Sequence, residues 1–311
     1  MVVIANKWDV LEKIGEGSFG QVFAGVDAET GERVAIKREA AEAHVPQLEH
    51  EYELYRYLTN VPGFPRVLYG GREGQYNVMV MEQLGPSLKD LQRKSPAGML
   101  PLRTVVYCVP HMLRRLEDLH ARGIVFRDVK PGQFCVGQYG ENIHHAPMIY
   151  LVDLGLATYY TDKTGRHIAP KKPEFKKSKT GTARYASINV HKGRQHTRRD
   201  DIESLGYLIV ELVKGRLPWT NMRAMTSHEG WKKTLAMKED TLLYDLTDGL
   251  PDEFRMLLQY ARDLQFKDTP DYRWIERMFV ELALRLDEDA PGNRELIWEV
   301  EEQELEDGGG W

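Results

Sequence analysis

Cysteine is scarce in this sequence of 311 residues, which contains only Cys108 and Cys135. Two thiols provide neither a disulfide framework nor a set of metal ligands, so a small disulfide-stabilised secreted domain is excluded. The pattern is typical of a protein in a reducing compartment. We therefore expect an intracellular location, in the cytoplasm, the nucleus or both.

Long hydrophobic runs are also missing. No stretch approaches the length of a membrane-spanning helix, and no lipidation motif ends the chain. The net charge of −5 gives no general attraction to nucleic acid or to an anionic membrane, so we expect neither as a partner. The length is sufficient for two lobes, each with its own core.

Charge is distributed unevenly along the chain. Residues 163–199 contain twelve Lys and Arg against one acid, Glu174, whereas residues 299–307 contain six acids and no base. Such blocks are usually solvated surface. The basic block follows the candidate catalytic residues described below, which favours a role in attracting anions.

The hydrophobic pattern changes character along the chain. Apolar residues alternate in the first eighty or so positions, and Leu48, Tyr52, Tyr55 and Leu58 form one helical face. This predicts a five-stranded sheet with one helix, in which "YNVMVM" (residues 76–81) is an inner strand.

Helical spacing dominates after "LGPSLKDL". Residues 102–123 have an apolar helical face interrupted by Pro110, where we expect a kink, and residues 200–215 are apolar on nearly all sides, which predicts a buried helix. The predicted class is α+β, with a β-rich lobe at 1–84, a helical lobe at 85–298 and a disordered acidic tail at 299–311.

Gly15, Gly17 and Gly20 form a G-x-G-x-x-G pattern, which is a weak signal alone because many hairpins are glycine-rich. A dinucleotide-binding fold would need a helix directly afterwards, but the sequence continues as strand, turn and strand. A glycine-rich hairpin can instead cover a polyphosphate, with Phe19 capping the site from its tip.

Lys37 ends the apolar strand "RVAIK", where a surface lysine would be the ordinary interpretation. Its place after the glycine hairpin matches the V-A-I-K element that contacts nucleotide phosphates. A lysine in that position needs an anionic partner. Glu51 is our candidate, and the spacing leaves Glu49 and Glu53 open.

Polar residues follow the apolar run "GIVF". Asp128 can accept or orient a hydroxyl proton, Lys130 can neutralise a transferred phosphoryl group, and Gln133 offers an amide oxygen to a divalent ion. Asp153, in "YLVDLGLA", supplies the main carboxylate for such an ion, because hard cations prefer oxygen ligands. Each element is a weak or moderate signal, but their order and spacing together indicate phosphoryl transfer.

With these motifs the chain resembles a eukaryotic protein kinase, and more narrowly the casein kinase I family. The narrow resemblance depends on "LGPSLKDL", "RDVKP", "TGTARYASINVHKG" and "RRDDIESLGYLIVELVKGRLPW". It implies a bilobal protein kinase fold that transfers phosphate from ATP, with Mg²⁺, to Ser and Thr of acidic or phosphorylated protein substrates. We expect a monomer.

The resemblance also implies a set of site residues. Asp128 and Lys130 would be catalytic, Asp153 and Gln133 would bind the metal, Asp201 would anchor the catalytic loop, and Lys177 and Arg184 would bind substrate anions. The implied ATP-binding residues are Ile14, Gly15, Gly17, Ser18, Phe19, Gly20, Val22, Ala35, Lys37, Glu51, Met81, Glu82 and Leu84.

The sequence departs from the family pattern in three places. Phe126 stands where His is usual, in a position that mostly packs. Gln133 replaces Asn and adds a methylene, which predicts reduced activity or altered metal use, with Mn²⁺ as an alternative ion. Ser227, His228 and Gly230 occupy places where relatives often carry basic residues, so recognition of phosphorylated substrates is expected to be weaker. The alternative function is a pseudokinase or scaffold that binds nucleotide with little catalysis.

Overall fold

The computed structural model describes residues 2–17, 20–137, 148–173 and 180–289. The chain divides into two compact units. The first consists of Met1–Pro86 and Phe134–Ala157, and the second of Ser87–Gln133 and Thr158–Trp311. None of the described helices has the length and apolar character needed to cross a membrane.

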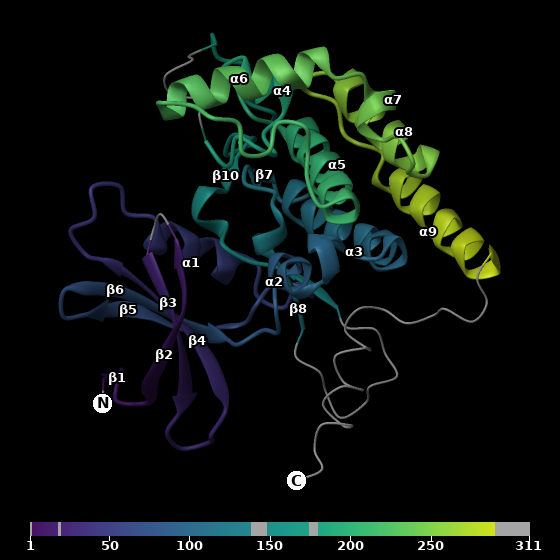
Figure 1. Ribbon diagram of the computed structural model, residues 1–311. Coiled ribbons are helices and arrows are strands. Elements are labelled where there is room, and N and C mark those ends of the chain that lie inside the picture. The colour runs from purple at the N-terminus through teal and green to yellow at the C-terminus, as the bar shows by residue number, and fades with distance from the viewer. Residues whose placement is uncertain (1, 18–19, 138–147, 174–179, 290–311) are drawn as a thin grey trace. The chain divides into compact units, whose positions relative to one another are not determined.

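The first unit is built on an antiparallel sheet of six strands in the order β1-β2-β3-β4-β6-β5 (Figure 1). The prediction that residues 76–81 form an inner strand is confirmed, because β6 pairs with β4 on one side and β5 on the other. The strands are β1 (Val3–Ile4), β2 (Trp8–Gly17), β3 (Gly20–Asp27), β4 (Arg33–Ala40), β5 (Val67–Glu73) and β6 (Tyr76–Glu82).

The predicted number of five strands is wrong by one, because β1 adds an edge strand. Ala5 and Asn6 have positive φ angles of 48° and 52°, and this turn brings Ile4 opposite Trp8. Both side chains are buried in a cluster on one face of the sheet. A strand of two residues is too short to show alternation, which is why the sequence pattern missed it.

Helix α1 (Leu48–Tyr57) packs against β5 and β6. Its predicted apolar face is confirmed, since Leu48, Tyr55 and the following Leu58 are buried and Tyr52 is half-buried. A short antiparallel ribbon of β8 (Phe134–Val136) and β9 (Ile149–Leu151) completes the first unit.

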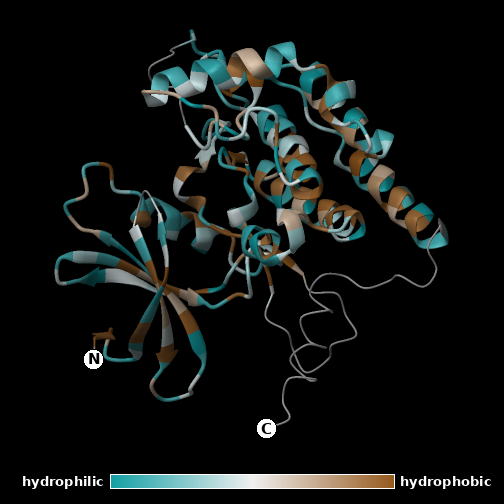
Figure 2. Cartoon of the chain, in the orientation of Figure 1, coloured by the Kyte–Doolittle hydropathy of each residue, from teal (hydrophilic) through white to brown (hydrophobic). Residues whose placement is uncertain are grey.

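The second unit is mainly helical, with α3 packed on α9 and on α5, and α5 packed on α8. Figure 2 shows hydrophobic and hydrophilic positions alternating along α9, as expected for a helix with one buried face. The helices are α2 (Leu88–Lys94), α3 (Leu102–His120), α4 (Ile188–His191), α5 (Arg198–Lys214), α6 (Ser227–Asp240), α7 (Leu243–Leu246), α8 (Asp252–Asp263) and α9 (Tyr272–Asp289).

The central helix of this unit is α5, and its predicted burial is confirmed from Arg199 to Leu212. A capping box between Thr197 and Asp200 begins the helix, and Gly215, with a φ of 76°, ends it. Helix α3 continues through Pro110. A two-residue pair, β7 (Ile124–Val125) with β10 (Thr158–Tyr159), lies at the start of the segment that carries Asp128.

Candidate active site

The glycine-rich pattern lies on the hairpin formed by β2 and β3, where Gly17 pairs with Gly20 and Gly15 pairs with Val22. Gly20 has a φ of 152°, and a Cβ atom there would lie 2.3 Å from the carbonyl oxygen of Arg38. Glycine is therefore required at this position. The predicted contacts Ser18 and Phe19 lie outside the described residues.

Strand pairing brings several predicted ATP-binding residues to one face of the sheet. Val22 lies opposite Lys37, and Ala35 lies opposite Met81. Directly paired residues share a face, and Ala35 and Lys37 are two positions apart on β4, so all four share a face. The opposite face of β4 carries Val34 and Ile36 in the buried cluster.

The other described residues of this group lie on β2 and around the end of β6. Ile14, on β2, has half of its surface exposed. Glu82 ends β6, where its carboxylate accepts a hydrogen bond from the backbone N–H of Arg66 at 3.0 Å, and Leu84 follows two residues later. The ATP-binding roles of these residues stay predictions.

Lys37 contacts two carboxylates in the first unit. Its Nζ lies 2.6 Å from Glu51 Oε2 and 2.8 Å from Asp153 Oδ1. Of the three acids that the sequence left open, Glu51 is therefore the one that contacts Lys37. The contact crosses from strand β4 to helix α1, so it also fixes α1 against the sheet.

Burial and neighbouring charges shift the pKa values of Lys37 and Glu51. Burial alone would lower the pKa of Lys37, but the carboxylates of Glu51 and Asp153 raise it above its usual value. Burial raises the pKa of Glu51 to about 7, and the attraction of Lys37 opposes that rise. Lys37 therefore stays charged at neutral pH, whereas Glu51 is poised close to its titration point.

Asp153 is held in a left-handed backbone conformation with a φ of 64°. Its backbone N–H donates to the buried hydroxyl of Tyr55 at 3.0 Å, and a ring nitrogen of His50 lies 2.9 Å from the carbonyl oxygen of Ala157. Both contacts come from α1. The helix that carries Glu51 therefore also positions Asp153.

The segment that carries Asp128 in the second unit is anchored by Asp201 of α5. Its carboxylate accepts hydrogen bonds from the backbone N–H groups of Phe126 and Arg127 at 2.8 and 2.9 Å. Imidazole nitrogens of His120 and His196 also contact this carboxylate, at 2.9 and 3.0 Å. Burial alone would raise the pKa of Asp201, but these imidazoles hold it below its usual range. The predicted anchoring contact is thus present.

Asp128 has three donors around its carboxylate. Lys130 Nζ lies 2.5 Å and Gln133 Nε2 3.3 Å from Oδ2, while the Thr182 hydroxyl donates to Oδ1 at 2.9 Å. The carboxylate is 5 % exposed, so these contacts determine its orientation. A carboxylate oriented in this way can accept a proton from an attacking hydroxyl.

The two departures in this segment have different consequences. Phe126 is fully buried, in line with the expectation that this position packs. Gln133 donates its amide N–H to Asp128, and its amide also carries an oxygen, the type of atom that can bind a cation. The longer side chain therefore retains the atom type that a metal site needs.

Arg184, one of the two predicted anion-binding residues, has a partner inside the chain. Its guanidinium lies 2.9 Å from Glu211 Oε1 and its side chain is 37 % exposed. The carboxylate of Glu211 also accepts a hydrogen bond from the hydroxyl of Tyr185. The other predicted residue, Lys177, lies outside the described residues.

Sequence reasoning missed Gly181 and Thr182 although it singled out their motif. Gly181 has a φ of +84°, and a Cβ atom there would lie 2.4 Å from the carbonyl oxygen of Arg127. The close approach places Thr182 within reach of Asp128. The clue was the small residue before a hydroxyl in "GTARYAS", but only the fold shows what lies opposite.

Comparison with known proteins agrees with this geometry. The model of the protein kinase domain matches residues 8–268. Casein kinase I homolog 3 of Schizosaccharomyces pombe is 39 % identical over 315 residues, an alignment that spans 99 % of this chain and 68 % of that protein. Casein kinase I homolog 1 of Saccharomyces cerevisiae is 38 % identical over 314 residues, spanning 99 % of this chain and 55 % of that protein. The chain therefore belongs to the casein kinase I family, as an ATP-binding serine/threonine protein kinase with the α+β protein kinase fold.

Proposed function

We propose that this kinase transfers the γ-phosphoryl group of ATP to Ser and Thr hydroxyls in acidic or phosphorylated protein substrates, and that it acts as a monomer. The observation that carries the catalytic part is the environment of Asp128. Its buried carboxylate is oriented by Thr182 and Gln133 and paired with Lys130. Asp128 would orient the substrate hydroxyl and accept its proton, and Lys130 would neutralise charge on the phosphoryl group.

The cluster in the first unit fits ATP and a divalent cation. Lys37 is a permanently charged donor for phosphate oxygens, and Asp153, whose side chain is about one-third exposed, is a carboxylate ligand for a hard cation. Gln133 would contribute an amide oxygen. When bound, Mg²⁺ neutralises the charge of the phosphates. The proposal requires that Lys37, Asp153 and Asp128 serve the same ATP molecule.

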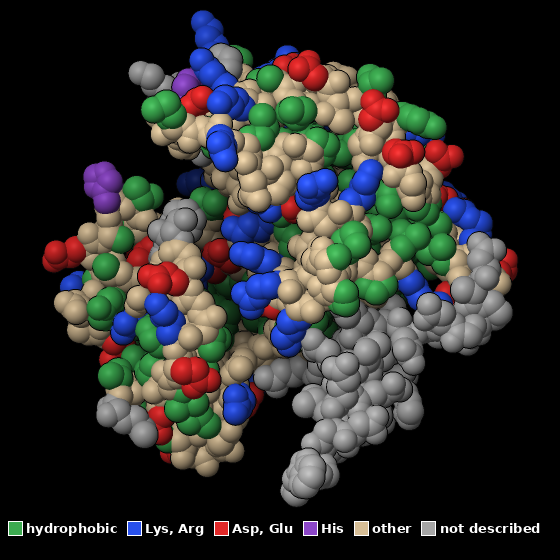
Figure 3. Space-filling view, viewed as in Figure 1, with side chains coloured by type: hydrophobic (Ala, Val, Ile, Leu, Met, Phe, Trp, Pro, Cys, Tyr) green, Lys and Arg blue, Asp and Glu red, His purple; other side chains and the backbone are tan. Residues whose placement is uncertain are grey.

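Preference for acidic substrates is supported by cations near Asp128 in the second unit. Helix α2 packs on the Pro131–Gln133 turn, and Lys89 of this helix is exposed. The side chain of Lys130, just before the turn, is about one-third exposed. Figure 3 shows Lys and Arg side chains close together over the part of the second unit where α2 lies. Further along the chain, Lys163, Lys171 and Lys172 are exposed. Such a field attracts acidic and phosphorylated peptides.

The proposal is tested by phosphoryl transfer from ATP to casein and to an acidic peptide library. Wild type is compared with Asp128→Asn, first with Mg²⁺ and then with Mn²⁺. We expect transfer by the wild type with either ion, and a loss of about 10³-fold or more in Asp128→Asn, because the substituted amide cannot accept the proton. A neutral peptide of the same length is the control for the acidic preference.

The alternative, a scaffold that binds nucleotide without catalysis, is favoured by one feature, the replacement of Asn by Gln133. Transfer no greater than that of Asp128→Asn, with both ions, would establish it. Gln133→Asn separates the effect of side-chain length from other causes. A large gain in kcat would show that the added methylene holds the cation ligand out of place, since an error of about 1 Å can cost about a hundredfold in rate.

A further inference from the structure

Lys238, on helix α6, is fully buried. Among the described residues no carboxylate forms an ion pair with its ammonium group. A buried cation without a carboxylate partner is costly, so its surroundings must hold it in another way. This burial could not be predicted from the sequence, because a lysine on a helix is ordinarily solvated.

Backbone carbonyls and aromatic rings surround the Lys238 ammonium. Nζ donates to the carbonyl oxygens of Ala186 at 2.5 Å and Ala183 at 3.1 Å. It also lies 4.5 Å from the ring centre of Tyr207 and 5.1 Å from that of Trp219, distances at which ring faces attract a cation. Burial lowers the pKa of Lys238 well below its usual value.

The two carbonyls belong to a short segment, residues 182–187, which we call the substrate-side loop. One end of this loop is Thr182, whose hydroxyl donates to Asp128. The other end is Ser187, which caps α4 and donates to Asp200 at 2.5 Å. Lys238 therefore donates hydrogen bonds to the middle of the loop, and the two ends of the loop are held by Asp128 and Asp200.

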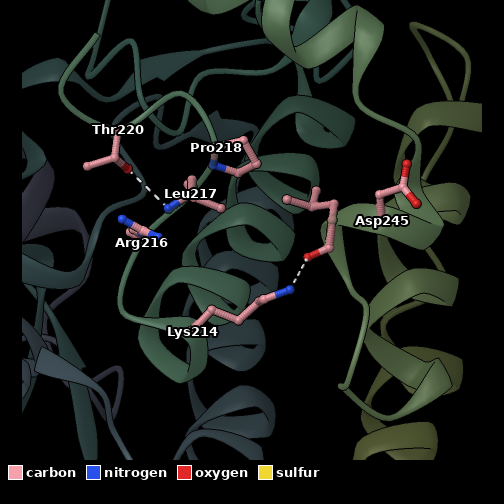
Figure 4. Close-up of a pocket in the computed structure, with 7 residues that line it drawn as sticks. Lys214, Arg216, Leu217, Pro218, Thr220 and Asp245 are labelled. Carbon is pink, nitrogen blue, oxygen red and sulfur yellow. Dashed lines mark hydrogen bonds between the residues drawn. The ribbon is translucent and has the colours of Figure 1, made fainter. Parts of the chain in front are cut away.

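Trp219 contacts the same loop through a hydrogen bond that does not involve Lys238. Its indole N–H donates to the carbonyl oxygen of Arg184 at 2.7 Å. Figure 4 shows how the chain beside it is fixed, with the backbone N–H of Leu217 donating to the Thr220 hydroxyl at 3.0 Å and Lys214 donating to the carbonyl oxygen of Leu246 at 3.3 Å. Loss of the Lys238 ammonium would remove the donor from the carbonyl of Ala186 and one of the two donors from the carbonyl of Ala183, which also lies 3.0 Å from His191 Nε2.

We propose that Lys238 is a positioning residue for phosphoryl transfer, which holds the substrate-side loop so that Thr182 orients the carboxylate of Asp128. The inference rests on the proposed role of Asp128. It assigns a catalytic consequence to a side chain that touches neither ATP nor the reacting hydroxyl. An apolar side chain would fill the volume but would leave the carbonyl of Ala186 without its donor and the carbonyl of Ala183 with only the ring nitrogen of His191, 3.0 Å away.

The experiment is a double-mutant cycle on kcat with an acidic peptide, using Lys238→Met, Thr182→Val and the double variant. Lys233→Met is the matched control, because Lys233 lies on the same helix with an exposed side chain that pairs with Glu229. We expect Lys238→Met to lower kcat by about tenfold to a hundredfold and to leave KM for ATP within about twofold of wild type. Residues in one contact chain couple, so the double variant should lose little more than the worse single variant.

A purely structural role predicts a different result. Lys238→Met would then melt earlier but keep its kcat below the melting transition, or its effect would multiply with that of Thr182→Val, and either result overturns the proposal. If Lys238→Met does not fold, the same cycle is run with Lys238→Arg, which keeps a buried cation but places its donors differently. Lower kcat at a wild-type melting temperature supports the proposal, and unfolding of this variant as well assigns Lys238 to the core and rejects it.

The proposed function is tested separately in the same series. Asp128→Asn reports on the role of Asp128 alone. Full activity of Lys238→Met beside an inactive Asp128→Asn would reject the inference and leave the proposed function standing. An active Asp128→Asn would reject the role of Asp128 whatever Lys238 does.

Discussion

At the scale of single residues, the contacts of Lys37 predict a stability change that depends on pH. Lys37→Met leaves Glu51 buried, 1 % exposed, without its cation. Breaking a buried pair by removing one partner costs about 3 kcal/mol. Glu51 already has a pKa of about 7, and without Lys37 that pKa rises further, so at pH 6 Glu51 takes up a proton and avoids much of the cost. We expect a larger loss in the free energy of unfolding at pH 8 than at pH 6.

Urea unfolding of wild type and Lys37→Met at the two pH values measures this difference. The double variant Lys37→Met/Glu51→Gln is the control. Because a neutral amide cannot titrate, its loss in the free energy of unfolding should be the same at pH 6 and pH 8. An equal loss at pH 6 and pH 8 in Lys37→Met would show that Glu51 is not the group responsible.

His191 predicts a second pH effect, on the acid side. Burial, and then the charge of Lys238 with its Nζ 3.3 Å away, lowers the pKa of His191 to about 3. An unfolded histidine titrates near pH 6.5, so between about pH 3 and 6.5 the unfolded state binds more protons and stability falls as the pH falls. The slope is at most about 1.4 kcal/mol per pH unit, so the loss from pH 6.5 to 5 is at most about 2 kcal/mol.

The comparison that isolates this effect is wild type against His191→Gln. The Gln amide nitrogen can still donate to the carbonyl oxygen of Ala183, as His191 Nε2 can at 3.0 Å, but it does not titrate. Denaturation midpoints measured from pH 7 to 5 should fall more steeply for the wild type. Parallel curves would refute the assignment.

Single residues also show where sequence reasoning was limited. Asp128, Lys37 and Asp201 stand in motifs shared with a known family, so their roles could be anticipated from that resemblance, although spacing alone left Glu49, Glu51 and Glu53 open as partners of Lys37. Lys238 and Thr182 could not, because their roles depend on carbonyls and carboxylates that lie 52 and 54 residues away along the chain. Periodicity describes a segment and its own faces, but not which distant backbone atom meets a side chain.

At the scale of elements, the packing of α5 on α8 depends on Gly206. A Cβ atom there would lie 2.6 Å from Leu258 Cδ2, and Leu258 is fully buried. In α6, a Cβ on Gly230 would meet only the Cβ of Ala224, at 3.6 Å. Replacing either helical glycine by Ala gains about 1 kcal/mol of helix propensity, but overpacking costs about 1–3 kcal/mol at Gly206 alone. We expect Gly230→Ala to be about 2 kcal/mol more stable than Gly206→Ala.

Urea midpoints of both variants and of wild type check this expectation. Because the same substitution is made in both helices, the difference reports packing and not propensity. Equal urea midpoints for Gly206→Ala and Gly230→Ala would mean that α8 can move away from α5 without a loss in the free energy of unfolding.

Elements with a strong period were predictable, and short ones were not. The inner strand β6 and the buried helix α5 carry runs long enough to show their period. The edge strand β1 has two residues and arises from a turn of left-handed residues, Ala5 and Asn6, neither of which is glycine. Such a turn is selected by the burial of Ile4 and Trp8, which is a tertiary effect.

At the scale of the whole molecule, the family resemblance could be read from motifs because kinase residues recur in a fixed order. The division of the chain was harder to read. Residues 134–157 belong to the first unit, although they follow more than forty residues of the second. The reason is physical: Asp153 pairs with Lys37, and its backbone N–H donates a hydrogen bond to the hydroxyl of Tyr55. A sequence pattern does not reveal that the chain returns to the first unit in this way.

The charge distribution of the whole molecule leads to the last prediction, which concerns salt. A net charge of −5 should repel acidic substrates, so any attraction must come from local cations such as the exposed Lys171 and Lys172. Salt screens such fields over about 10 Å at 0.1 M. We expect kcat/KM for an acidic peptide to fall by about tenfold between 0.05 and 0.5 M NaCl, with a much smaller change for a neutral peptide.

Location, and not total charge, should decide this salt dependence. Lys171→Gln with Lys172→Gln, and Lys267→Gln with Arg273→Gln, each remove two exposed positive charges, so both take the net charge from −5 to −7. Only the first pair lies in the basic segment, so only that variant should lose kcat/KM for the acidic peptide at low salt and show a flatter salt profile. Equal losses in the two variants would mean that substrates respond to the overall charge of the protein and that the basic segment has no special role in attracting them.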